Sequence, residues 1–185
     1  QFRKYLAGRP QVSGTASQSI ELNREFSFPL RDDQGLPTNA QIKYTITKAE
    51  LTPSIVIKGQ KATAVSGRTF LIISLKLENP TSSSLTIKTR DFVRLLPQGS
   101  TDRLAPDIHN DPTEIQAIST KLTRVGFPVD VSIKNFLLYI GEINGQKQEI
   151  PLDFTWIQWI TQPEESVETS SKKSIHLYSN LIGAR

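Results

Sequence analysis

Short segments in which apolar and polar residues alternate recur along this chain, and they constrain its fold more than any other feature. About eight such segments follow one another at short spacing, and no βαβ alternation is visible. Alternation with a period of two places the apolar side chains on one face of a strand. Since a run of strands without intervening helices is typical of packed antiparallel sheets, the sequence predicts an all-β sandwich or barrel with little helix.

The segment at residues 69–77 gives the strongest strand signal, because its first half is apolar on both faces, as in a central strand. Residues 26–30 contain Pro29, which cannot donate to a ladder, and are expected at a sheet edge. Further strands are predicted at residues 42–47, 55–57, 85–87, 91–96, 127–133, 136–140 and 150–154. Six side chains of the two longest inner segments are expected in the core: Leu71, Ile73, Leu75, Phe127, Val129 and Val131.

Turn and cap signals separate the predicted strands. The Asp32-Asp33-Gln34-Gly35 sequence predicts a turn. Asn144-Gly145 is the preferred pair for a tight hairpin turn between the last two strands. Asp111-Pro112-Thr113-Glu114 predicts one helical turn, with Asp111 as the N-cap and proline at the first helical position.

Composition excludes several classes of function. The chain has no cysteine, which excludes disulfides, thiolate catalysis and cysteine-bound zinc. Its net charge of +4 comes from 22 basic and 18 acidic residues scattered along the chain, which argues against a nucleic-acid partner. The chain also has no methionine, so Gln1 is not expected to be the encoded start, and a signal or anchor segment near the membrane is expected upstream.

The chain divides into three predicted parts. Residues 1–23 are polar and read as an extended arm, residues 24–160 hold the predicted strands, and residues 161–185 form a C-terminal extension. The length of 185 residues suits one domain with ordered extensions.

Several motifs, in this order, resemble a family of bacterial extracytoplasmic immunoglobulin-like domains of unknown function, similar to the mycobacterial immunoprotective antigen domain. They are Tyr44-Thr45-Ile46-Thr47, Gly67-Arg68-Thr69-Phe70-Leu71-Ile72-Ile73, Leu75-Lys76-Leu77-Glu78-Asn79, Asp91-Phe92-Val93-Arg94-Leu95 and Gly126-Phe127-Pro128-Val129. The resemblance covers roughly residues 40–154. It departs at residues 122–125, where members often carry Pro-Gly and this chain has Leu-Thr-Arg-Val. It implies an immunoglobulin-like antiparallel sandwich in a secreted protein or envelope lipoprotein, with no enzymatic role.

No catalytic or cofactor motif is present in the sequence, so we expect neither an enzyme nor a cofactor. The best metal candidate is the loop containing Asp107, His109 and Asp111, which gathers two carboxylates and an imidazole within five residues. Calcium sites do not favour histidine, and the EF-hand spacing is missing. We therefore expect structural loop residues there, with Asp111 capping the turn at Pro112.

The C-terminal part carries the candidate contacts with a partner. Trp156 and Trp159 are the two tryptophans of the chain, and a strand there would place large apolar groups on both of its faces. That segment either covers an open end of the sandwich or contacts a partner protein or membrane interface. Further along, two pairs spaced four apart would share one stripe of a short helix: Leu177 with Leu181, and Tyr178 with Ile182. This stripe is expected to dock, on its own sandwich or on a neighbouring chain.

Three functional hypotheses follow. The first is a non-catalytic interaction or structural module of a bacterial cell-envelope protein, presented outside the cytoplasmic membrane. The second is an accessory subunit of a larger membrane-bound assembly that docks through its termini. The third is a small-ligand or ion-binding domain that uses the loops at the ends of the sandwich.

Overall fold

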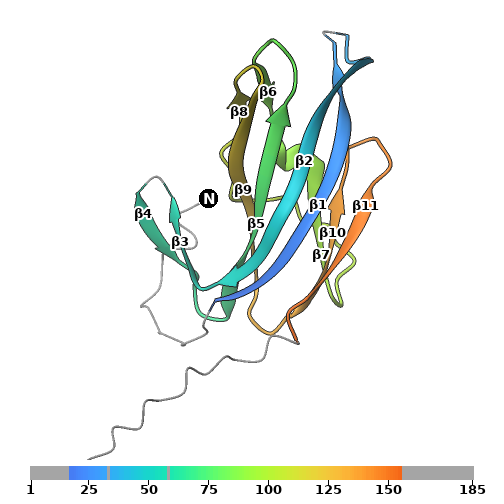
Figure 1. Ribbon diagram of the computed structural model, residues 1–185. Helices are drawn as coiled ribbons and strands as arrows, with labels where there is room; N and C mark the ends of the chain where they lie inside the picture. The colour runs from blue at the N-terminus through green and yellow to red at the C-terminus, as the bar shows by residue number, and fades with distance from the viewer. Residues whose placement is uncertain (1–16, 33, 58, 156–185) are drawn as a thin grey trace, which may run out of the picture.

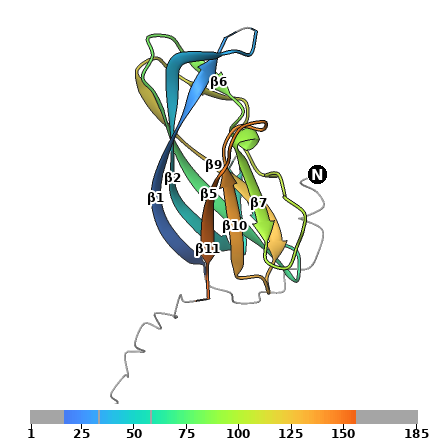
Figure 2. The ribbon, with the colours of Figure 1, turned by 90° about the vertical axis from the view of Figure 1, so that its right-hand side faces the viewer.

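Two antiparallel β-sheets packed face to face make up the fold (Figure 1). The structure is a computed structural model, and it describes residues 17–32, 34–57 and 59–155. The larger sheet has four strands in the order β1-β2-β5-β9, and the smaller has three in the order β11-β10-β7. Figure 2 shows the smaller sheet in front of the twisted larger one. The all-β sandwich predicted from the sequence is confirmed.

The elements of the larger sheet are β1 (Gln18–Arg31), β2 (Pro37–Thr52), β5 (Arg68–Asn79) and β9 (Ser119–Asp130). Those of the smaller sheet are β7 (Val93–Pro97), β10 (Asn135–Ile140) and β11 (Gln148–Asp153). Two short pairs accompany them: β3 (Ser54–Ile57) with β4 (Gln60–Thr63), and β6 (Leu85–Ile87) with β8 (Thr113–Ile115). The one helical element in the described part of the chain is a 3-10 turn, η1 (Thr89–Phe92). No helix there is long and apolar enough to cross a membrane.

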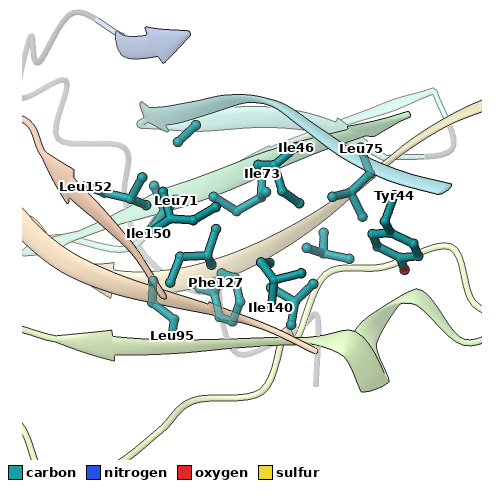
Figure 3. Close-up of a cluster of buried hydrophobic side chains, with 14 of the residues drawn as sticks. Tyr44, Ile46, Leu71, Ile73, Leu75, Leu95, Phe127, Ile140, Ile150 and Leu152 are labelled. Carbon is teal, nitrogen blue, oxygen red and sulfur yellow. The ribbon is translucent and has the colours of Figure 1, made fainter. Parts of the chain in front are cut away.

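The main core lies between the two sheets and is built by alternation (Figure 3). In β2, Ile42, Tyr44 and Ile46 point inward and are fully buried, while Lys43 is exposed on the outer face. The same alternation in β5 and β9 buries five of the six predicted core residues: Leu71, Ile73, Leu75, Phe127 and Val129. Across the interface, side chains of the smaller sheet complete the core: Val93, Leu95, Phe136, Leu138, Ile140, Ile150 and Leu152.

A second, smaller cluster explains why β5 is apolar on both faces near its start. Phe70 and Ile72 point to the outer side of the sheet and are buried there beneath Ile55 and Ile108, which come from β3 and from the loop before β8. Gly126 makes room for this cover, since a Cβ at that position would meet Ile72 Cδ1 at 2.6 Å and Ile108 Cδ1 at 3.1 Å. The central position of β5 is thereby confirmed.

β1 is longer than the sequence predicted. It begins at Gln18, so residues 18–23, which were read as part of an extended arm, pair with β2. The polar composition hid this strand because a bulge interrupts its alternation between Glu21 and Arg24, where Asn23 has a φ of 48°. The edge position predicted from Pro29 is confirmed.

Four local predictions were wrong. Residues 91–96 do not form one strand, because η1 occupies its start and β7 begins at Val93. β9 starts at Ser119 and ends at Asp130, whose carboxylate accepts hydrogen bonds from the backbone and hydroxyl of Ser132. Val131 therefore lies in a turn, half-buried rather than in the core. The Asn144-Gly145 pair lies in a longer loop, residues 141–147, rather than in a two-residue turn.

The fourth wrong prediction is the helical turn at Asp111. Residues 113–115 form the strand β8, and Asp111 does not cap its own segment. Its carboxylate instead accepts hydrogen bonds at the start of η1, from the backbone N–H groups of Thr89 and Arg90 at 2.7 and 2.8 Å and from the Thr89 hydroxyl at 2.7 Å. An N-cap motif identifies a residue suited to satisfy free N–H groups, and here those groups come from a segment about 20 positions earlier.

Candidate functional site

A cleft at one end of the sandwich is a candidate site on the described surface. It lies between the β1–β2 turn, η1 and the β10–β11 loop, and it has a volume of about 450 Å³. Clefts of this size accommodate small ligands or a few inserted side chains. We call it the loop cleft, and its lining residues are Arg31, Gly35, Asp91, Phe92, Glu142, Ile143 and Asn144.

An ion pair joins two walls of the loop cleft. The Arg31 guanidinium donates to both oxygens of Glu142, from Nε at 2.9 Å and from Nη2 at 2.7 Å. Its Nη1 donates to the Gly35 carbonyl at 2.7 Å. The hydrogen bonds to Glu142 raise the pKa of Arg31. Such bidentate geometry fixes the relative position of the two loops more than a single contact would.

The β1–β2 turn presents an apolar side chain beside the loop cleft. Asp32 Oδ1 accepts hydrogen bonds from the backbone N–H groups of Gln34 at 3.0 Å and Leu36 at 2.8 Å. Gly35 has a φ of 79°, a conformation that favours glycine. This turn chemistry was predicted, and it holds Leu36 with 57% of its surface exposed.

The β10–β11 loop presents a second apolar side chain on the opposite wall. Lys147 Nζ donates to the carbonyls of Glu142 and Ile143, both at 2.8 Å, and Gly145 N–H donates to the Glu142 carbonyl at 3.1 Å. These bonds close the loop on itself and leave Ile143 56% exposed. The loop cleft is thus preformed. Ile143 belongs to its lining and Leu36 directly follows the lining residue Gly35, and we call these two exposed apolar residues the rim side chains.

An aromatic cluster supports the loop cleft from below. The rings of Phe28, Tyr44 and Phe92 have centroids 5.0 to 5.7 Å apart. Phe92 belongs both to this cluster and to the cleft lining. Tyr44 is fully buried and donates its hydroxyl hydrogen bond to the Thr89 carbonyl at 3.3 Å, so it presents no hydroxyl at the surface. The cluster couples the cleft floor to the main core.

The pH dependence of stability is expected to report on Tyr44. Burial, followed by the charges of Asp111 and Asp91, raises the pKa of Tyr44 well above 10.0. Its neutral form contributes stability in full below about pH 10, and that contribution is lost as pH rises further, because the unfolded tyrosine ionises first.

We therefore expect Tyr44→Phe to cost about 0.5–1.5 kcal/mol at neutral pH through the lost hydrogen bond. Above about pH 10 the wild-type protein should lose stability faster than the variant, by about 1.4 kcal/mol per pH unit. Urea unfolding of both proteins between neutral and alkaline pH measures this. A difference between them that stays constant with pH would contradict it.

In the loop with the metal candidates Asp107, His109 and Asp111, the side chains of His109 and Asp111 are engaged in contacts within the protein. Both Asp111 oxygens accept hydrogen bonds at η1. His109 Nδ1 accepts from the Asp111 N–H at 3.2 Å, and its Nε2 lies 3.5 Å from Arg90 Nη1. Within residues 17–32, 34–57 and 59–155, no three His, Asp or Glu side chains are grouped so as to hold a metal ion.

Millimolar calcium or zinc is accordingly expected to leave the melting temperature unchanged, which a thermal melt with and without the metal measures. A clear rise in the melting temperature that disappears in Asp107→Ala would contradict this and would favour the ion-binding hypothesis.

The other predicted site residues lie outside the part of the chain that the structure describes. They are Trp156, Trp159, Leu177, Tyr178, Leu181 and Ile182. Of the loop cleft, the sequence predicts the turns at residues 32–35 and 144–145 but not the ion pair that joins its walls. Arg31 and Glu142 are 111 positions apart, and each resembles an ordinary solvated charge in its own segment.

Comparison with known proteins shows that a solved structure has a similar fold. No protein-family model matches the chain, and no curated protein does. A conserved hypothetical protein from Bacillus anthracis, solved by crystallography, superposes with a TM-score of 0.50 at 12% identity, over 75% of this chain and 99% of that one. The likeness shows a shared fold and nothing more. An uncharacterised β-sandwich protein from Clostridium difficile has a TM-score of 0.48 at 12% identity, over 77% of this chain and 99% of that one.

Proposed function

We propose that this chain is a non-catalytic binding module of a bacterial cell-envelope protein and that it holds a protein partner at the loop cleft. The observation that carries the proposal is the preformed cleft with Ile143 exposed in its lining and Leu36 exposed directly after the lining residue Gly35. Apolar surface bordered by polar groups is typical of contact surfaces between proteins, and in the cleft lining Ile143 has Glu142 and Asn144 as neighbours. Loops at the end of a sandwich are also the part of this architecture that most often binds.

The rigidity of the two loops favours binding. Each is closed by its own hydrogen bonds, and the Arg31–Glu142 ion pair connects them. A surface that is already ordered loses less conformational entropy when a partner binds. Burying the rim side chains against a partner can therefore add to the binding free energy, because the loops need little reorganisation.

The proposal is non-catalytic because the charged groups near the cleft already have structural partners. Arg31 and Glu142 bind each other, and Asp111 is held by Thr89 and Arg90. A general base needs a free acceptor within hydrogen-bond reach of a nucleophile. His109 instead uses Nδ1 to accept from a backbone N–H.

The proposed location outside the cytoplasmic membrane is supported by the motif resemblance to extracytoplasmic immunoglobulin-like domains. Protease added to intact cells that produce the tagged full-length protein tests it. We expect cleavage of this protein while a cytoplasmic marker stays intact. Protection until the cells are lysed would contradict the location.

The partner-binding role is tested by placing a photo-crosslinking amino acid at Ile143 or Leu36 of the full chain in its native cells. Val56 is the matched control, because it is similarly exposed at 54% but lies on the β3–β4 hairpin. We expect one protein to crosslink to both cleft positions and not to Val56. Crosslinking that is absent from both positions, or equal at all three, would contradict a partner at the loop cleft.

A further inference from the structure

One strand edge of the larger sheet is open over about half of its length. β9 pairs with β5 on one side along its whole extent, Ser119–Asp130. On its other side, among the described residues, the only pairing is the bridge between Gly126 and Ile108. The stretch from Ser119 to Val125 has no described strand paired along that edge, and most of its residues are exposed.

The backbone groups of this stretch face outward at every second residue. Gly126 N–H donates to the Ile108 carbonyl at 2.8 Å, and Ile108 N–H donates back to the Gly126 carbonyl at 3.1 Å. Both backbone groups of Gly126 therefore point away from β5. Since the direction alternates along a strand, the N–H and C=O groups of Thr120, Leu122 and Arg124 also point to the open side. They form a ready template for another strand.

The other edges of the two sheets carry features that discourage such pairing. β1 contains Pro29 and the bulge at Asn23, and β11 contains Pro151. The outer side of β7 is bridged between Leu95 and Leu104. Prolines, bulges, covering segments and charged side chains are the usual protections of a sheet edge. In the part of the chain described, the first half of β9 has no proline, bulge or covering segment, and its charged residues are Lys121 and Arg124.

The most exposed large apolar side chains of the described residues also lie at the start of this edge. Ile118 and Leu122 are 76% and 74% exposed, the highest values among the large apolar side chains described. Ile118 moreover has a φ of 47°, which is unfavourable for a β-branched residue. Ile118 and Leu122 therefore leave apolar surface exposed at the start of the open edge.

We propose that this edge pairs, antiparallel, with the same edge of a second copy of the chain, about a twofold axis at Leu122. The open stretch, residues 119–125, is centred on Leu122, so this register uses every outward backbone group and stops before the Ile108 bridge. It joins the two larger sheets into one continuous sheet across the dimer.

The side chains of the edge are complementary to themselves in this register. Leu122 lies opposite Leu122 of the second copy, which buries two exposed side chains together. Arg124 lies opposite Thr120, and Lys121 lies opposite Thr123, so no basic residue faces another directly. This self-complementarity favours a second copy over an unrelated strand, and twofold pairing is the commonest form of homo-oligomer.

A disulfide across the axis tests the register. The chain has no cysteine, so Leu122→Cys introduces a single thiol. Residues opposite each other in a hydrogen-bonded antiparallel pair have Cα atoms about 5.5 Å apart, within the range a disulfide spans. Under mild oxidation of the full chain we expect a covalent dimer from Leu122→Cys and monomer from the control Val56→Cys, which is also exposed, at 54% against 74% for Leu122. Equal crosslinking of the two variants would overturn the proposal.

Sedimentation of the full-length wild-type chain tests association without a covalent link. We expect a dimer, and we expect Leu122→Lys and Leu122→Glu each to raise the dimer dissociation constant at least about tenfold through like-charge repulsion at the axis. Mixing the two variants places opposite charges there and should restore the dimer. A monomeric wild type, or variants that dimerise as well alone as when mixed, would overturn the proposal.

Discussion

Truncating Phe127 to alanine is expected to lower the free energy of unfolding by about 3–5 kcal/mol. Phe127 is fully buried and paired across β9 and β5 with Leu71, which is also fully buried. Figure 3 shows its ring between the two sheets, near Leu95 and Ile140. The substitution removes a ring from a close-packed interior and leaves a cavity that the paired strands cannot close. Urea denaturation of the wild type and the variant measures the loss.

Two valines on either side of the end of β9 provide the matched control. Val129 is 2% exposed and belongs to the core, so Val129→Ala should cost about 2 kcal/mol. Val131 lies in the following turn and is half-buried, so Val131→Ala should cost less than about 1 kcal/mol. Equal losses for the two valines would show that the strand continues through Val131, as its alternation alone suggested.

Asp111→Ala is expected to cost about 3 kcal/mol, the second largest effect, although alanine removes no packed apolar group. The side chain is 4% exposed and accepts hydrogen bonds from two backbone N–H groups, from the Thr89 hydroxyl and, at 3.5 Å, from the Thr113 hydroxyl. Hydrogen bonds to a charged group are stronger than neutral ones, and the donors at Thr89 would lose their partner in a buried place. The loss would loosen η1, which carries Phe92 at the loop cleft.

Asp111→Asn keeps one acceptor oxygen and should cost about half as much. Asp102→Ala removes an exposed carboxylate from the loop after β7 and should change the free energy by less than about 0.5 kcal/mol. Chemical denaturation of the three variants gives the values. If Asp111→Ala and Asp102→Ala were equally mild, the carboxylate would not organise η1.

The strand pattern could be predicted from the sequence because it is local. Ile42, Tyr44 and Ile46 alternate with polar residues within six positions, and the sheet buries that face. The uninterrupted apolar run around Ile72 also predicts that β5 is buried on both of its faces. Alternation of this kind depends only on the geometry of the strand. It can therefore be recognised in the sequence before the neighbouring strands are known.

The loop cleft could not be predicted because its parts come from distant segments. Arg31 and Glu142 meet only after both sheets have formed, and Asp111 satisfies N–H groups that lie 22 positions earlier. The prediction that Asp111 caps a turn at Pro112 was wrong, because local sequence does not say which donors a carboxylate will meet. The limits of β9 were missed for a related reason, since the turn at Asp130 depends on a side-chain bond to Ser132 that competes with the strand pattern.

The binding role of the loop cleft is tested most directly by measuring how tightly the partner found by crosslinking at Ile143 binds the wild type and three variants of the full chain. Leu36→Asp and Ile143→Asp each place a charge on an apolar rim position, and Val56→Asp makes the same change at a comparably exposed position away from the cleft. Burying that charge against a partner should weaken binding at least about tenfold for the two rim variants and leave Val56→Asp near the wild-type value. Titration calorimetry would measure all four dissociation constants, with melting temperatures confirming that each variant is folded. Equal affinities for the wild type and both rim variants would contradict a binding role for the loop cleft.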